Sequence, residues 1–314
     1  MTSQQRPGPH HRKIRMHGTH KKGRWRLDYL ALVTAILTIA GTLVLNYPTI
    51  SNWVSQYNQS KIITQAAQSA ATVEPDPKAQ IEQAHAYNGA LHSGALVEAH
   101  TNIPTGTGSS DNEKLDYASI LRASDNGLMG RVRIPSIDVD LPIYHGTSDE
   151  TLLKGVGHLE GTSLPVGGSS TRSVLTAHRG LAEARLFSDL DKVVEGDTFT
   201  IEVFDEVLTY RVHTIQVVEP HENESLRVEE GRDLATLVTC TPLGVNSHRI
   251  LLTGERVLPT PAVDIAKAGS TPDIPRFPWW AIYIPAIIIA AIIYVWRAGY
   301  PPRTKRSGDA SSTQ

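Results

Sequence analysis

Two long runs of apolar residues without charge stand near the two ends of the chain. The first, YLALVTAILTIAGTLVL at residues 29–45, approaches the roughly 20 residues that cross the hydrocarbon of a bilayer. The second, WWAIYIPAIIIAAIIYVW at residues 279–296, has aromatic residues at both ends, where lipid headgroups would lie. Pro285 inside it would kink a helix without forbidding one. We predict that both runs are transmembrane helices, at residues 27–47 and 278–296.

Between these runs a polar stretch comes first. Residues 49–72 are rich in Gln, Ser and Ala, which suits a stalk or a peripheral helix that follows the end of the first span at Pro48. Apolar residues recur at helical spacing within residues 78–91 and predict one short amphipathic helix. Residues 95–112 are rich in Gly, Ser, Thr and Pro, which is typical of a loop.

After Gly130 the chain consists of short runs with β-branched residues, separated by turn residues. These runs predict strands within residues 131–144 (divided at Pro135), 172–178, 197–204, 207–219, 234–240 and 249–257. The segments SDETLLKG (148–155) and AEARLFSDL (182–190) predict short helices between them. So many strands at this spacing predict a mostly β fold, a small closed barrel of about 130 residues.

The net charge of −2 conceals a segregation of charge along the chain. Residues 1–26 hold eight Lys or Arg and no acid, residues 297–314 hold four basic residues and one acid, and residues 29–296 hold 18 basic and 30 acidic residues. Because basic segments stay on the cytoplasmic side, both termini are predicted to be cytoplasmic and residues from about 48 to 277 extracellular. No small-residue cleavage site follows the first run, so we expect an uncleaved anchor.

Two alternatives to this membrane arrangement are weaker. The apolar runs could be core helices of a soluble protein, but a run flanked by eight positive charges suits a globular interior poorly. The basic tip PHHRKIRMHGTHKK could bind nucleic acid, but this is a weak alternative, because setting topology and touching anionic lipid account for the tip. We therefore expect the cell membrane, and no nucleic acid, as a partner.

The segment LVTCTPLG at residues 237–244 contains Cys240, the single cysteine among 314 residues, so no internal disulfide can form. LATLVTC ends at Cys240 and RILLTGERV begins at Arg249 after an eight-residue loop. If these strands pair as an antiparallel hairpin, Cys240 and Arg249 lie at the same rim. His178 ends the strand RSVLTAH, where period two places it on one face with Val174 and Thr176.

A cysteine, a histidine and an arginine placed together could carry out acyl transfer. A thiolate attacks a carbonyl, an imidazolium gives a proton to the leaving amine, and a guanidinium holds the oxyanion. Plainer roles stay open on the residues alone: Cys240 as a small buried apolar residue, His178 as a structural histidine and Arg249 as a surface residue. A zinc site is disfavoured because no second cysteine exists. No metal or other cofactor is expected.

Three stretches resemble a known family. TLVTCTPLGVNSHRILLTGER (236–256), GHLEGTSLPVGGSSTRSVLTAHRGL (157–181) and NGLMGRVRIPSIDVDLPIYHGT (126–147) are similar to the sortases, membrane-anchored cysteine transpeptidases of Gram-positive bacteria, and most of all to the pilus-assembling class C. The resemblance covers roughly residues 115–258. It implies an eight-stranded sortase-type β-barrel, with Cys240 as nucleophile, His178 as general acid/base and Arg249 as transition-state stabiliser. It also implies that Thr239 lines the substrate groove, and we place Thr176 there with it.

The resemblance further implies a reaction and its partners. A sortase cuts an LPxTG-like sorting signal of a secreted protein after Thr, holds it as a thioacyl-enzyme and passes it to an amine. In class C that amine is a pilin lysine, so pilin subunits are the expected partners. The alternatives are a sortase that anchors proteins to a cell-wall precursor, and, from another class, a non-catalytic barrel that binds secreted proteins. A thiol redox sensor would want a resolving cysteine, which this chain lacks.

One departure concerns the lid that class C enzymes carry over the site. The only Asp-Pro here, Asp76-Pro77, precedes Lys78 rather than an aromatic residue, so we expect no standard lid, although residues 95–112 could cover the site in another way. The predicted segments are a basic cytoplasmic tail (1–26), a transmembrane helix (27–47), an extracellular stalk and loop segment (48–114), the catalytic β-barrel (115–258), a linker (259–277), a transmembrane helix (278–296) and a basic cytoplasmic tail (297–314).

Overall fold

The structure is a computed structural model that describes residues 24–69, 73–92, 95–96, 105–106, 109–110, 116–124, 126–222 and 224–300. The chain divides into two compact units. One is made of Met1–Leu45 and Ala281–Gln314, and the other of Asn46–Trp280. The second unit contains the predicted barrel.

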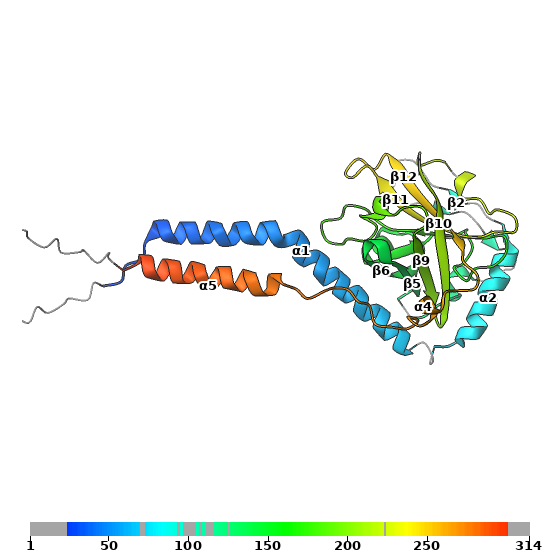
Figure 1. Ribbon diagram of the computed structural model, residues 1–314, viewed down its shortest axis with the longest axis horizontal. Helices are drawn as coiled ribbons and strands as arrows, with labels where there is room; N and C mark the ends of the chain where they lie inside the picture. Colours follow the sequence, from blue (N-terminus) through cyan, green and yellow to red (C-terminus); the bar gives the residue numbers. More distant parts are fainter. Residues whose placement is uncertain are drawn as a thin grey trace, which may run out of the picture. The chain divides into compact units, whose positions relative to one another are not determined.

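Eight strands close into one barrel in the order β10-β12-β11-β8-β7-β6-β5-β9 (Figure 1). They are β5 (Leu128–Ile134), β6 (Val139–His145), β7 (Val156–His158), β8 (Thr171–Thr176), β9 (Thr198–Val203), β10 (Glu206–Val218), β11 (Asp233–Thr241) and β12 (His248–Arg256). The pairs β8–β11 and β6–β7 are parallel, and the other neighbours are antiparallel. This architecture confirms the predicted fold class, an eight-stranded barrel with short helices.

The barrel has apolar side chains on both faces of its central strands. Leu175 of β8, Leu237 of β11 and Leu252 of β12 are fully buried in the main core. A second, smaller cluster covers the outer face of the same strands, with Leu159, Val174, Leu226, Val238 and Leu251 as members. Strands buried on both faces have nearly continuous apolar sequences, which accounts for the run LATLV before the cysteine.

Some of the local elements match those predicted from the sequence, and others do not. Pro135 divides the first predicted run, because a single 3₁₀ turn, Pro135–Ile137, stands between β5 and β6. The helix α3 (Asp149–Lys154) confirms the one predicted at 148–155. The helix predicted at 182–190 is wrong. Leu186 there has a left-handed φ of 41°, which no α-helix continues through, and its side chain is buried in the core.

The helix α1 (Tyr29–Ser69) continues through Pro48, so the predicted first span and the residues that follow it form one helix. A proline inside a helix costs one backbone hydrogen bond but leaves the turns on both sides free to continue. Residues 49–69 are therefore helical, as the stalk or peripheral helix was expected to be.

The helix α2 (Pro77–Ala90) confirms the predicted amphipathic helix and lies beside the barrel (Figure 1). Asp76 precedes it and accepts a hydrogen bond from the backbone N–H of Lys78, with Pro77 at the first helical position. The Asp-Pro dipeptide therefore starts a helix here. Residues 95–112 lie mostly outside the described residues, so the expectation of no standard lid stays a prediction.

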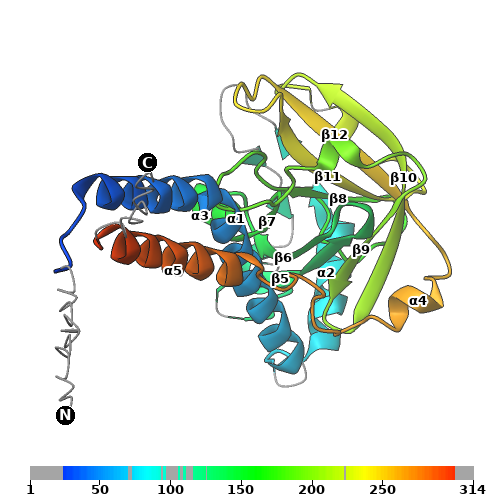
Figure 2. The same ribbon diagram turned by 60° about the vertical axis from the view of Figure 1, so that its left-hand side comes forward.

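In the unit made of the chain ends, the first part of α1 and the helix α5 (Trp280–Ala298) lie side by side (Figure 2). The indole Nε1 of Trp25 donates to the carbonyl of Trp296 at 3.1 Å. A Cβ on Gly299 would collide with the same indole, so this close approach requires glycine. Among the described helices, α1 and α5 are the two that are long and apolar enough to cross a membrane.

Four charged side chains are gathered on the outer face of β5, β6 and β9, and we name them the charge cluster: Arg131, Arg133, Asp140 and Glu202. Arg131 donates to both carboxylate oxygens of Asp140, at 2.5 and 2.6 Å. Arg133 lies 3.3 Å from Glu202. All four side chains are largely buried, so each charge depends on its partners for the solvation that water would otherwise give.

The charge cluster also holds the chain that follows the barrel. Arg131 donates to the carbonyl of Ser270 at 2.7 Å, and the backbone N–H of Gly269 donates to Glu202 at 2.6 Å. Arg133 donates to the carbonyl of Lys267 at 3.0 Å. The segment predicted as a linker, residues 259–277, is thus attached to the barrel over part of its length.

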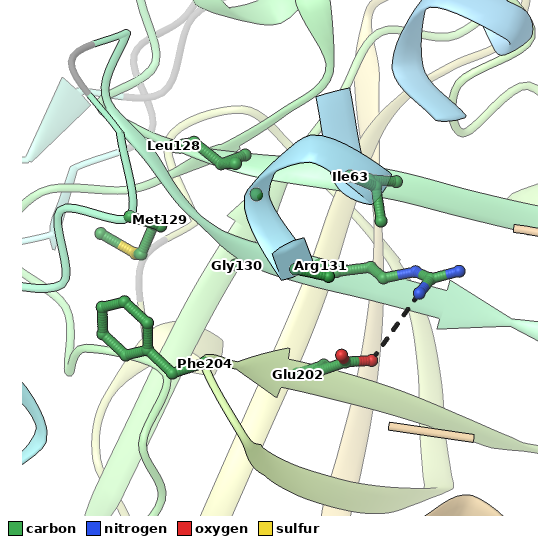
Figure 3. Close-up of a pocket in the computed structure, with 10 residues that line it drawn as sticks. Ile63, Leu128, Met129, Gly130, Arg131, Glu202 and Phe204 are labelled. Atoms are coloured by element: carbon green, nitrogen blue, oxygen red, sulfur yellow. Dashed lines mark ion pairs between the residues drawn. The ribbon is translucent and has the colours of Figure 1, made fainter. Parts of the chain in front are cut away.

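A pocket opens beside the charge cluster, between α1 and the strands β5 and β9 (Figure 3). Ile63, Met129 and Phe204 supply apolar walls, and the Arg131–Glu202 pair, 3.8 Å apart, lies at its edge. Around the closed barrel, β5 is four strands from β11 in either direction. The pocket is therefore on the side of the barrel opposite to the cysteine.

Candidate active site

The strand register brings the three predicted catalytic residues together. Cys240 of β11 and Arg249 of β12 are direct antiparallel partners. On the other side of β11, Val238 is paired with Thr176 of β8 in parallel register. Both parallel strands advance in the same direction. Extending this register by two residues therefore places Cys240 opposite His178. Cys240 therefore lies between the histidine and the arginine.

The three side chains also share one face. Val174 of β8, Val238 of β11 and Leu251 of β12 belong to the cluster on the outer face of the sheet. His178, Cys240 and Arg249 are an even number of residues from these positions, so alternation along extended chain directs them to the same outer face. The site is thus built on the covered outer face of β8, β11 and β12.

Burial decides the protonation of Cys240. Its side chain is largely withdrawn from water, with 6% of the residue exposed. Burial raises the pKa of the thiol above its ordinary value, and the positive charge of Arg249 acts in the opposite direction. Since burial is the larger effect, it favours the neutral thiol.

His178 responds to burial in the opposite sense. It is half-buried just after β8, and burial lowers the pKa of its imidazole below the ordinary value, while the carboxylate of Asp149 opposes the shift. Burial therefore favours the neutral imidazole, which can accept a proton from a thiol. Asp149, the first residue of α3, was not predicted as part of this site.

Arg249 is only 2% exposed, so its charge is held at the site by the protein. Its Nη1 donates to the carbonyls of Asn246 and His248, at 2.9 and 3.0 Å. Asn246 lies in the loop that joins β11 to β12, and His248 is the first residue of β12. These bonds fix the guanidinium beside Cys240, and its positive charge can stabilise an oxyanion that forms there.

The two predicted substrate-binding threonines lie in different places. Thr176 is buried on the outer face, between Gly157 of β7 and Val238 of β11. Thr239 alternates with Cys240 and so faces the barrel interior, where its hydroxyl donates to the carbonyl of Ala177 at 2.8 Å. The hydroxyl is thus turned away from the face that carries Cys240, and the role of Thr239 in the substrate groove stays a prediction.

Sequence reasoning also missed Arg179, which directly follows His178. Its Nη1 donates to the hydroxyl of Thr241 at 2.8 Å, and its Nη2 lies 2.6 Å from Asp191. The signal was available, because the arginine stands next to the predicted histidine, but its partners are distant in sequence. Among the described residues no group of three or more His, Cys, Asp or Glu side chains is placed to hold a metal ion.

Comparisons with known proteins agree with this fold. The family model described as "Sortase domain" matches residues 132–257. The crystal structure of sortase C-1 from Actinomyces oris is 46% identical, and the match covers 58% of this chain and 98% of that chain with a TM-score of 0.51. Sortase C1 from Streptococcus agalactiae is 41% identical, with 64% and 100% covered and a TM-score of 0.55.

Curated proteins give a consistent result at lower identity. Sortase A from Streptococcus agalactiae serotype III is 23% identical over 235 residues, which are 73% of this chain and 83% of that protein. From its barrel, its domain match and these relatives, the chain belongs to the sortase family and is a cysteine transpeptidase.

Proposed function

We propose that Cys240 is the nucleophile of this sortase, His178 its general acid and base, and Arg249 the residue that stabilises the transition state. The observation that carries the proposal is the register: Cys240 is the direct partner of Arg249. The β8–β11 register, which ends at Thr176 and Val238, supports a position for His178 opposite Cys240 when it is extended by two residues. Opposite pKa shifts of the thiol and the imidazole, both caused by burial, support a neutral resting pair.

The reaction follows from these roles. His178 takes the proton of the Cys240 thiol as sulfur attacks the carbonyl carbon of the scissile peptide bond, and the oxyanion forms beside Arg249. The carbon–nitrogen bond then breaks, and the imidazolium gives its proton to the leaving amine. An incoming amine attacks the resulting thioester and loses a proton to His178. The carbon–sulfur bond breaks, and the thiol recovers its proton.

The substrate is an LPxTG-like sorting signal cut after Thr, and the acceptor is a lysine of a pilin. The identities of 46% and 41% to two sortase C structures, against 23% to a Sortase A, support the pilin acceptor. A further match at 39% identity, sortase C of Streptococcus pneumoniae, carries a title that names pilin substrate specificity. Covalent joining of pilin subunits is the function that these likenesses favour.

The two apolar helices anchor the enzyme with its barrel outside the cell and both termini in the cytoplasm. Support comes from the length and composition of α1 and α5, and from the twelve basic residues against one acid in residues 1–26 and 297–314. Labelling of single cysteines placed in the tails and in the barrel of a Cys240→Ala background, in intact cells, tests this topology. Labelling of a tail by an impermeant reagent would contradict it.

The catalytic proposal is tested with the full chain in detergent, mixed with a secreted pilin that carries its sorting signal. Intact mass is expected to show a thioacyl adduct on Cys240, and denaturing gels a ladder of joined subunits. A pilin whose acceptor lysine is replaced by arginine serves as the matched control, and should form the adduct without the ladder.

Other outcomes separate the alternatives. An adduct that resolves only by hydrolysis, or only with wall-peptide amines, would replace pilin joining with anchoring to the cell wall. If no adduct forms, the assay is repeated after deletion of residues 95–112. An adduct that forms only then identifies a covered site, and continued absence would leave a non-catalytic binding barrel.

A further inference from the structure

The backbone ladder between β8 and β11 ends before it reaches the proposed catalytic pair. The paired register ends at Thr176 and Val238, and one further bond follows, from the N–H of Ala177 to the carbonyl of Val238 at 3.2 Å. His178 and Cys240 are the next residues along the two chains. Their relative placement therefore depends on contacts other than the ladder.

Two side-chain hydrogen bonds bracket the pair. On the strand side, the hydroxyl of Thr239 donates to the carbonyl of Ala177 at 2.8 Å. On the loop side, Nη1 of Arg179 donates to the hydroxyl oxygen of Thr241 at 2.8 Å. Each bond joins a direct neighbour of His178 to a direct neighbour of Cys240.

Arg179 is itself firmly held. Its side chain is 7% exposed, its Nη2 lies 2.6 Å from Asp191, and its Nε donates to the carbonyl of Ser188 at 3.2 Å. The guanidinium thus joins the turn after His178, the segment around Asp191 and the end of β11. Moving it would leave a buried charge without its partners, which is costly, so this arrangement is stiff.

The next residues of the two chains also fit together. Gly180 has a φ of +77°, and a Cβ there would lie 2.5 Å from Cδ2 of Leu243 in the loop after Cys240. The backbone N–H of Gly180 donates to the hydroxyl of Ser188 at 3.0 Å. The turn that follows His178 is therefore seated against the turn that follows Cys240, which gives a third contact beyond the ladder.

We propose that Arg179 is a positioning residue for the transpeptidation, acting through the hydroxyl of Thr241 to hold His178 opposite Cys240. This rests on the proposed function, because it takes His178 and Cys240 as the reacting pair. Proton transfer needs heavy atoms about 2.6–3.2 Å apart, and a misplacement of about 1 Å costs roughly 100-fold in rate. The hydrogen bond from Arg179 to Thr241 lies one residue beyond His178 and Cys240, and it removes the freedom of movement that would allow such a shift.

The bridge is tested with Thr241→Val, which keeps the shape of the side chain and removes the hydroxyl that accepts from Arg179. In the full chain in detergent, we expect the kcat of thioacyl formation to fall by roughly 10–100-fold with KM changed by less than about twofold. Thr241→Ser, which restores a hydroxyl, should return kcat to within about threefold of the unaltered chain. Stopped reactions analysed by intact mass give both constants.

Two more variants separate positioning from general damage. Arg179→Lys keeps a charge for Asp191 but lacks the planar set of donors, so it should lose kcat as Thr241→Val does. Arg185→Ala breaks a more exposed ion pair, with Asp189 at 2.6 Å in the same loop, and should keep the kcat of the unaltered chain. Alkylation of Cys240 by iodoacetamide at fixed pH requires no histidine, and its rate should stay within about twofold in Thr241→Val.

Each contrary outcome has a distinct meaning. Unchanged kcat in Thr241→Val, or an equal loss in Arg185→Ala, would overturn the positioning role while leaving the catalytic proposal intact. If alkylation slowed by the same factor as kcat, the defect would lie in the reactivity of the thiol itself. That result would also overturn the positioning role of Arg179. If the unaltered chain and Arg185→Ala form no adduct at all, the proposed function fails and the positioning role fails with it.

Discussion

On the outer face of β5, β6 and β9, the charge cluster pairs two guanidinium groups with two carboxylates, at distances of 2.5 to 3.8 Å. On the opposite side of the barrel, the outer face of β8, β11 and β12 carries the buried Cys240 and the half-buried His178, and burial disfavours the charged form of both. Both faces remove titratable side chains from water, and they differ in how the cost of burial is met.

In the charge cluster, opposite charges offset the lost hydration, so the result is a fixed junction that also holds the carbonyls of Lys267 and Ser270. Around Cys240, burial instead favours the uncharged forms, so the thiol and the imidazole keep a proton transfer available for the reaction. The comparison teaches that burial serves stability where charges are paired and reactivity where an acid and a base are kept neutral side by side.

Removing the thiol should give the largest effect. We expect Cys240→Ala to lower transpeptidation by at least about 10⁴-fold, because no thioacyl-enzyme can form, with a stability change of about 1 kcal/mol or less. Adduct mass and subunit joining measure the loss of activity, and the thermal midpoint of the full chain measures the change in stability. A Cys240→Ala chain that still joins substrates would end the proposed role of this face.

How much of this site could be predicted depends on distance along the chain. Cys240 and Arg249 are joined by one short loop, so pairing them required only the rule for hairpins. The parallel pairing of β8 with β11 crosses two other strands in sequence, and residue pattern alone gives no register for it. His178 was singled out because it ends a predicted strand, and its pairing with Cys240, like the groove role of Thr239, was implied by family resemblance.

The fold shows the same limit. Most strands had apolar runs long enough to be predicted, but β7 has only the three residues VGH, too short for any period. Arg131 and Asp140 are 9 residues apart on one hairpin, whereas Glu202 reaches the cluster through the closure of the barrel. Closure and irregular packing, as around Leu186, are tertiary properties that local pattern does not contain.

Breaking the charge cluster should give the next largest effect, on stability alone. Asp140→Ala leaves the largely buried Arg131 without its bidentate partner, and we expect a loss of about 3–5 kcal/mol and a thermal midpoint lower by roughly 10 °C. The kcat per folded molecule should be unchanged, because β5 and β6 are far around the barrel from Cys240.

The matched control for this change is Glu150→Ala, which breaks the exposed Lys154–Glu150 pair. It should leave the thermal midpoint where it was, since exposed ion pairs add little. Replacing both members of the buried pair, Arg131→Met with Asp140→Leu, should recover much of the lost stability. If Asp140→Ala instead lowered kcat at an unchanged midpoint, the division between the two faces would be wrong.

Changing the arginine of the catalytic face should have an intermediate effect. Arg249→Lys keeps a positive charge but cannot both bind the carbonyls of Asn246 and His248 and direct planar donors to an oxyanion. We expect kcat to fall by about 10²–10³-fold, the range seen when one oxyanion donor is lost. Arg211→Lys, on the exposed side of β10, is the control and should be neutral. Equal rates in the two variants would remove Arg249 from the mechanism.

The smallest expected effect is on the pH dependence of Cys240 ionisation. It is also the sharpest test of the contrast between the two faces of the barrel. Burial raises the pKa of the thiol above its ordinary 9.0 and lowers that of His178 below its ordinary 6.5. Above pH 9.0 the unfolded thiol ionises first, so stability falls as pH rises through the folded pKa. Below pH 6.5 the unfolded imidazole gains its proton first, so stability falls as pH drops.

Alkylation of Cys240 as a function of pH measures the thiol directly, because only the thiolate reacts. We expect a midpoint above 9.0 in the unaltered chain, and a further upward shift in Arg249→Gln, since the charge of Arg249 opposes the effect of burial. Asp140→Ala, on the other face, should not move the midpoint. A midpoint well below 9.0 would mean that the resting site holds a thiolate–imidazolium ion pair. The catalytic face would then be a paired site like the charge cluster, and the distinction between paired and neutral burial would not hold for this barrel.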